Sequence, residues 1–151
     1  MIQLHIVFTT EMIKLFLPKM LENHYGHILN LGSTGSYMPC PYDAVYVATK
    51  AYILSMSKGL NAELKGTGAS ITVLCQGSTK IEFAHKAGME NTLLFKLFVM
   101  KPETGAHIGY SALIKIKGAV TPGLYNKLLV LSSKILPASI VSYSTKLMLK
   151  G

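Results

Sequence analysis

The sequence contains no arginine, so all 15 of its basic residues are lysines, and with seven acidic residues they give a net charge of +8. Arginine is the side chain whose planar guanidinium reads guanine and grips phosphate through paired hydrogen bonds. The lysines are spread from Lys14 to Lys150 without a dense run. This distribution is typical of a solvated surface, so we predict no nucleic-acid partner.

Long apolar runs are also missing, although 50% of the residues are hydrophobic and only 15% are charged. No run approaches the ~20 residues that span a bilayer. The first residues lack the basic start and small-residue cleavage site of a secretory signal. We therefore expect a cytoplasmic protein, and these features do not favour membrane contact. The two cysteines, Cys40 and Cys75, are too few for a disulfide framework, and we expect them to be reduced.

A glycine-rich phosphate-binding turn is the third absence. A dinucleotide needs such a turn between a strand and a helix, because the backbone must approach the pyrophosphate closely. The sequence has no G-x-G-x-x-G or Walker pattern, and its nearest candidate is the short run from Gly32 to Gly35. We therefore expect no complete dinucleotide platform in this chain.

The patterns that are present alternate between strands and helices, as in β-α-β units with a parallel sheet. A chain of 151 residues is about one domain. Thr9, Thr10 and Glu11 indicate a helix start, and Pro18 is expected to bend that helix. Residues 80–101 are expected to form one or two short helices. The predicted strands are 27–31, 70–75 and 119–121, and the predicted helices are 10–23, 46–64, 102–117, 124–133 and 138–149.

Tyr46 and Lys50 are separated by one helical turn, and Ser33 follows the first predicted strand. Residues at i and i+4 share a helix face. An ammonium beside a phenol favours the phenolate and lowers the phenol pKa from its free value of about 10. A tyrosine tuned in this way suits general acid–base catalysis near neutral pH. Ser33 would hydrogen-bond the reacting oxygen, so the three residues predict a carbonyl or alcohol redox site.

These residues and their context resemble the short-chain dehydrogenase/reductases. The similar stretches are Tyr-x-x-x-Lys at 46–50, the runs at 17–20, 26–33 and 48–51, and those at 63–68 and 70–75. The resemblance implies an α/β fold, a partial Rossmann-like three-layer α/β/α arrangement with a short parallel sheet of about three strands. The family's glycine-rich turn belongs to the first half of its domain, so we expect this chain to correspond to the second half only, a truncated domain.

The resemblance also implies a function. Hydride would pass between NAD or NADP and a carbonyl or secondary alcohol, with Ser33, Tyr46 and Lys50 as the catalytic residues. Tyr46, Lys50, Gly77 and Thr79 would bind the cofactor. Binding by this chain alone is in question, because the glycine-rich half is expected to be missing. We expect no metal.

Three positions depart from the family's pattern. By alignment through residues 17–20, His5 replaces an asparagine that supports a proton relay. Gln76 replaces the proline of a Pro-Gly pair, and Ile81 replaces a threonine that holds the nicotinamide amide.

Within the single domain, we expect residues 1–78 to form the core with the site, 79–101 the substrate lobe, and 102–151 the C-terminal helices and last strand. The lobe carries apolar residues from Phe83 to Phe98, which indicate an apolar substrate or simple packing on the sheet. Ser36, Tyr37 and Tyr42 would touch the substrate or form a turn. His24 and His27 have the spacing of a metal pair but no completing ligands, so surface histidines are favoured.

A non-catalytic alternative remains open. In the family the helices matching 10–23 and 46–64 form a dimer interface. The chain would then be an impaired subunit that forms homo- or hetero-oligomers, for instance with a full-length relative. With too few strands, an edge and apolar faces would be uncovered, which favours association. A third alternative is peripheral membrane attachment through the lysine-bearing apolar helices near the C-terminus.

Overall fold

The computed structural model of the chain describes residues 1–79 and 99–149. The segment 80–98, with Ile81 and most of the predicted substrate lobe, lies outside the described residues. In the described part, three parallel strands form one sheet in the order β1 (Gly26–Leu31), β2 (Ala69–Leu74) and β3 (Ala119–Val120). The predicted α/β class with a short parallel sheet is confirmed.

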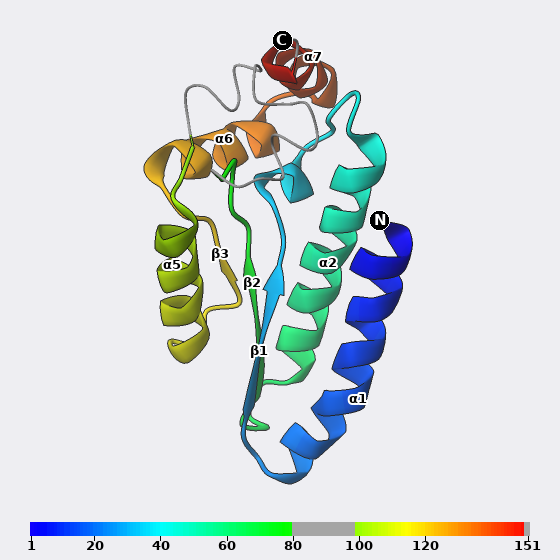
Figure 1. Cartoon of the computed structure of the whole chain (residues 1–151), viewed down its shortest axis with the longest axis vertical. Coiled ribbons are helices and arrows are strands. Elements are labelled where there is room, and N and C mark those ends of the chain that lie inside the picture. The colour runs from blue at the N-terminus through cyan, green and yellow to red at the C-terminus, as the bar shows by residue number, and fades with distance from the viewer. Residues whose placement is uncertain (80–98, 150–151) are drawn as a thin grey trace.

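The sheet is covered on both faces, which makes the three layers visible in Figure 1. The helices α1 (Thr9–Glu22) and α2 (Ala44–Glu63) lie on one face, and α5 (Pro102–Ile114) lies on the other. The helices α6 (Leu124–Ile135) and α7 (Ala138–Leu149) lie beyond the carboxyl ends of the strands. This arrangement leaves β1 at one edge, with β2 in the centre.

The central strand β2 organises the core. All six of its residues are buried, as expected for a parallel strand with helices on both faces. Ile71 packs with Ile13 and Leu64, which links β2 to α1 and α2. Val73 packs with Ile53 and Leu54 of α2 in a second cluster. The continuous apolar pattern of residues 70–75 therefore predicted burial correctly.

The first helical segment begins earlier than the threonine signal predicted. A π-helical segment, η1 (Gln3–Phe8), precedes α1 without a break. The hydroxyl of Thr10 donates a 2.7 Å hydrogen bond to the carbonyl oxygen of Ile6, so this side chain lies along the helix and does not cap its start. Pro18 lies inside α1, which continues to Glu22.

The turn that feeds β2 depends on Gly68, whose φ is +85°. A Cβ there would run into the backbone carbonyl of His24. Gly68→Ala is therefore expected to lower the free energy of unfolding by about 1–3 kcal/mol, measured by urea denaturation.

Gly59 is the matched control for that substitution, because it lies inside α2 with nothing within 4 Å of an added Cβ. Gly59→Ala is expected to stabilise the protein by about 0.5–1 kcal/mol. Equal effects of the two alanines would contradict the account of Gly68.

Candidate active site

A cavity of about 610 Å³ opens at the carboxyl ends of β1 and β2, where open α/β sheets bind their ligands. The cavity is lined by all five residues predicted for the site: Ser33, Tyr46, Lys50, Gly77 and Thr79. They come from three places in the chain, namely the segment after β1, the first two turns of α2 and the segment after β2. The fold thus brings the predicted set together.

Ser33 is held in place by a reciprocal cap at the start of the 3₁₀ helix η2 (Thr34–Tyr37). Its hydroxyl accepts a 3.1 Å hydrogen bond from the backbone N–H of Gly35. In return its own backbone N–H donates to the Ser36 hydroxyl at 3.1 Å. This capping box fixes the Ser33 side chain at the cavity. Ser36 is buried and forms the turn, the second of the two roles considered for it.

Tyr46 is half-buried at the start of α2, and its pKa is raised above the ordinary 10.0. Burial is the largest cause, and the charge of Asp43 acts in the same direction. A side-chain hydrogen bond with Ser33 lowers the pKa of Tyr46 but does not outweigh burial. The predicted lowering of the Tyr46 pKa below 10 is therefore wrong, because desolvation disfavours the phenolate more strongly than the neighbouring groups favour it.

Lys50 is buried and points to the end of β1, where its Nζ donates a 2.8 Å hydrogen bond to the carbonyl oxygen of Leu31. The ammonium is 5.7 Å from the centroid of the Tyr46 ring, so it lies over the ring face. Burial lowers the pKa of Lys50. The only ion pair among residues 1–79 and 99–149 joins Lys19 and Glu22, so no described carboxylate neutralises Lys50.

His5 adds a second titratable ring beside Tyr46. Its Nδ1 lies 2.9 Å from the hydroxyl of Thr49, and its ring centroid is 6.0 Å from that of Tyr46 in an edge-on contact. Thr49 in turn donates to the backbone oxygen of Tyr46 at 2.7 Å. Burial, then the charge of Lys50, lowers the pKa of His5. The aligned position singled out from the sequence therefore lies beside Tyr46.

The segment after β2 forms the side of the cavity predicted to receive the cofactor. The hydroxyl of Thr79 donates to the carbonyl oxygen of Gly77 at 3.2 Å. A Cβ on Gly77 would overlap the side chain of Asn126 from α6, so the glycine permits this close approach. Gln76 also lines the cavity.

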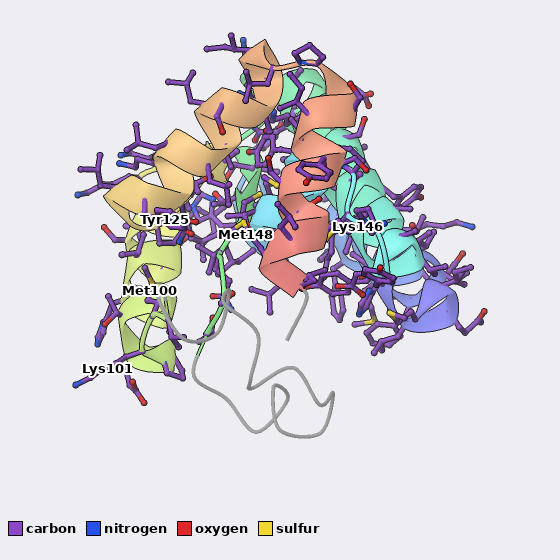
Figure 2. The ribbon with its side chains drawn as sticks, turned by 90° about the horizontal axis from the view of Figure 1, so that it is seen from above. Met100, Lys101, Tyr125, Lys146 and Met148 are labelled. Atoms are coloured by element: carbon purple, nitrogen blue, oxygen red, sulfur yellow. The ribbon has the colours of Figure 1, made fainter. Side chains whose placement is uncertain are left out.

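The apolar wall of the cavity was not found from the sequence. It includes Met38 and Val47 near the serine loop, and Leu129, Met148 and Leu149 from α6 and α7. In Figure 2, Met148 lies on the side of α7 that faces α6. Leu129, Met148 and Leu149 are distant in sequence from Ser33 and Tyr46, and only the inward packing of α6 and α7 brings them to the site.

The other residues singled out from the sequence are more peripheral. Tyr42 lines the cavity but is mostly exposed. The ammonium groups of Lys58 and Lys134 lie 5.4 and 5.3 Å from the centroid of the Tyr37 ring, and burial raises the pKa of Tyr37 to about 12. His27 hydrogen-bonds the Ser70 hydroxyl at 2.7 Å.

The structure also bears on the cysteines, on metal binding and on membrane spans. Cys40 and Cys75 are free thiols. In the described ranges no three His, Cys, Asp or Glu side chains are grouped to hold a metal. None of the helices described between residues 1 and 149 is long and apolar enough to cross a bilayer.

Solved structures with this fold extend over most of the chain. One is a 7beta-hydroxysteroid dehydrogenase structure, with a TM-score of 0.75 and 20% identity over 96% of this chain and 57% of that one. Another is a short-chain dehydrogenase from Sphingobium yanoikuyae in complex with NADPH, with a TM-score of 0.72 and 23% identity over 89% of this chain and 52% of that one. At these identities the likeness shows the fold alone.

Relatives in sequence match a shorter stretch. An uncharacterised oxidoreductase of Staphylococcus epidermidis is 38% identical over 77 residues, which is 51% of this chain and 34% of the relative. The NADP-dependent 3-hydroxy acid dehydrogenase of Escherichia coli is 41% identical over 61 residues, or 40% and 25% of the two chains. The chain thus spans about a third of the first relative and about half of the solved structures.

The family profile described as short chain dehydrogenase matches residues 1–91, which include the serine loop, α2 and β2. That match spans more than half of the chain. The chain therefore belongs to the short-chain dehydrogenase family.

Proposed function

We propose that this chain manages the proton in an NAD(P)-dependent reduction of a carbonyl compound, or the reverse oxidation of an alcohol. The observation that carries the proposal is the convergence of Ser33, Tyr46 and Lys50 on one cavity at the carboxyl ends of β1 and β2. Family membership supports the same class of reaction.

Each side chain has a role that follows from its surroundings. Tyr46, kept protonated by burial, donates its hydroxyl proton to the substrate oxygen as that oxygen gains negative charge. Ser33, fixed by its cap, directs its hydroxyl to the same oxygen and polarises the carbonyl. The Lys50 ammonium over the Tyr46 ring stabilises the phenolate that remains.

The cavity fits the nicotinamide end of a dinucleotide. Lys50 and Thr79 offer hydrogen-bonding groups, and Gly77 allows close packing beside them. When bound, a reduced nicotinamide supplies the hydride. The pyrophosphate end needs a glycine-rich turn that the sequence lacks.

We therefore take the chain to correspond to the part of the domain that follows that turn, and to hold the nicotinamide end of the cofactor. NADP is the first cofactor to test, because the Escherichia coli relative is NADP-dependent and the Sphingobium structure contains NADPH.

The substrate class follows from the cavity wall. Met38, Val47, Leu129, Met148 and Leu149 present aliphatic and thioether groups around the polar trio. Such a wall favours an apolar ketone over a sugar, since burying sugar hydroxyls without partners is costly.

The direct test supplies the purified chain with NADPH and a panel of apolar ketones and sugars, and follows oxidation of the nicotinamide. Ketone-dependent oxidation is expected, with little response to sugars. Tight NADPH binding without turnover of any carbonyl would contradict the proposal.

The pH dependence of kcat/KM should reflect the pKa of the buried Tyr46 phenol. Because burial raises the pKa of Tyr46 above 10.0, the phenol stays protonated through the neutral pH range. Carbonyl reduction should therefore stay level as pH rises through neutrality and fall only above 10.0. Alcohol oxidation needs the phenolate as proton acceptor, so its kcat/KM should increase as the pH approaches and passes 10.0. A fall of kcat/KM for reduction centred well below 10.0 would contradict this assignment.

A second candidate is a non-catalytic subunit, and the observation favouring it is the apolar outer surface of the first helical segment. Leu4 and Phe8 of η1 and Leu15 and Phe16 of α1 are all exposed. Such a surface suits association with a second copy or a relative. Sedimentation velocity tests it: association that Leu15→Glu abolishes, in a chain without turnover, would favour the subunit over the enzyme.

A further inference from the structure

The outer sides of α6 and α7 carry matching apolar stripes. The apolar residues follow at steps of four, three and four in α6 and of three and four in α7, which places each set on one side of its helix. The stripe of α6 is Leu124, Leu128, Leu131 and Ile135, that of α7 is Ile140, Tyr143 and Leu147, and Leu136 lies in the extended turn between the two helices. All eight side chains are exposed, Leu124 to 74% and Ile135 to 72%.

These exposed residues do not lie on the side of either helix that packs against the rest of the protein. α6 buries Asn126 and Val130 towards the rest of the protein. α7 buries Val141 and Thr145, and the Thr145 hydroxyl donates a 3.0 Å hydrogen bond to the carbonyl oxygen of Pro39. Both helices therefore pack against the rest of the protein through their inner sides, and the apolar stripes take no part in that packing. Seen from above in Figure 2, both helices lie over this end of the molecule and diverge from the turn that joins them.

The charge of this region has one sign. The last acidic residue of the sequence is Glu103, and every charged side chain after it is a lysine. Lys127 and Lys146 lie on α6 and α7 and are exposed beside the stripes, whereas the ammonium of the exposed Lys134 lies over the Tyr37 ring. Exposed leucine and isoleucine flanked only by lysine is the composition of a helix that lies in the surface of an anionic bilayer.

A second copy of the chain fits this surface poorly. A symmetric contact would bring the lysines of both copies into one interface, and the region 104–149 offers no carboxylate to pair with them. Lipid phosphate and serine headgroups supply the missing negative charge, and the acyl region receives the apolar stripes.

We propose that the outer face of α6 and α7 is a docking surface for an anionic lipid bilayer. The apolar stripes enter the headgroup boundary, and the lysines contact the lipid charges. The inner sides of the same helices line the candidate cavity, so docking holds that wall of the cavity next to the membrane. The inference does not depend on the proposed catalytic function, because it concerns the opposite side of the two helices.

The test is cosedimentation of the full chain with vesicles of equal parts phosphatidylcholine and phosphatidylserine, and with vesicles of phosphatidylcholine alone. Binding to the anionic vesicles is expected, with much weaker binding to the neutral ones. It should weaken as salt is added, because the lysine contribution is screened.

Two isoleucines make a matched pair of variants. Ile135 is the last residue of α6, and Ile114 is the last residue of α5, exposed to 54% at the opposite end of the sheet. Ile135→Glu is expected to lower the vesicle partition coefficient by about tenfold or more. Ile114→Glu, which adds the same charge, should leave it within about twofold.

Lysine variants distinguish docking through this face from nonspecific electrostatic attraction of a basic protein to anionic lipid. Replacing Lys127 and Lys146 with glutamine should lower partitioning about fivefold for each lysine. The same change at Lys65 and Lys115, also towards the opposite end, keeps the net charge equal and should have a much smaller effect. No binding to anionic vesicles, or equal loss from both lysine pairs, would overturn the proposal. So would a self-associated chain that Ile135→Glu converts to monomer without changing vesicle binding.

Discussion

Tyr46→Phe is expected to lower kcat/KM for carbonyl reduction by a factor of about 10²–10⁴. The substitution removes the one hydroxyl that is held beside both Ser33 and the Lys50 ammonium. The phenylalanine ring fills the same half-buried space, and burial of the phenol already disfavours its charged form, so the fold should tolerate the change. The measurement is the initial rate of nicotinamide oxidation with saturating cofactor.

The control for that loss is Tyr42→Phe. Tyr42 also lines the cavity, but its side chain is mostly exposed. Removing its hydroxyl should change kcat/KM by less than about threefold, since an exposed hydroxyl is easily replaced by water. If the two variants lose activity equally, the proton does not come from Tyr46 in particular.

Ile71→Ala is expected to lower the free energy of unfolding by about 2–5 kcal/mol. Ile71 is 0% exposed and joins the central strand to α1 and α2 through Ile13 and Leu64. Truncation leaves a cavity between the sheet and both helices, and the surrounding strand has little freedom to collapse into it. The change should appear as a lower urea midpoint with an unchanged slope.

An exposed isoleucine gives the comparison for Ile71. Ile135→Ala, at the end of α6, should change the free energy of unfolding by less than about 0.5 kcal/mol. A small effect at both positions would mean that Ile71 is not at the centre of a packed core.

The sheet was predictable because its signals are local. Residues 70–75 are apolar without alternation, and that pattern requires cover on both faces, as found for β2. Ser33 and the segment from Gly77 to Thr79 follow the carboxyl ends of parallel strands, which necessarily meet at one edge of a sheet. That Gly77 and Thr79 join Tyr46 and Lys50 at this edge was implied by the family resemblance and not by spacing alone.

Two properties of the site depended on tertiary packing and could not be predicted locally. The direction of the pKa shift of Tyr46 is set by burial, and the i, i+4 spacing says nothing about how much water the fold removes. The apolar wall from Leu129 and Met148 depends on where α6 and α7 fold back. The early start of the first helical segment was missed because Thr10 bonds backward to Ile6, where a cap was expected.

The most direct measurement of the proposed function is transfer of deuterium from C4-deuterated NADPH to an apolar ketone, detected in the alcohol product by mass spectrometry. We expect the unmodified chain to give an alcohol with deuterium on the carbinol carbon, and Tyr46→Phe to give almost none. A folded chain that binds the cofactor but yields no labelled alcohol from any ketone would contradict the proposed chemistry of Ser33, Tyr46 and Lys50.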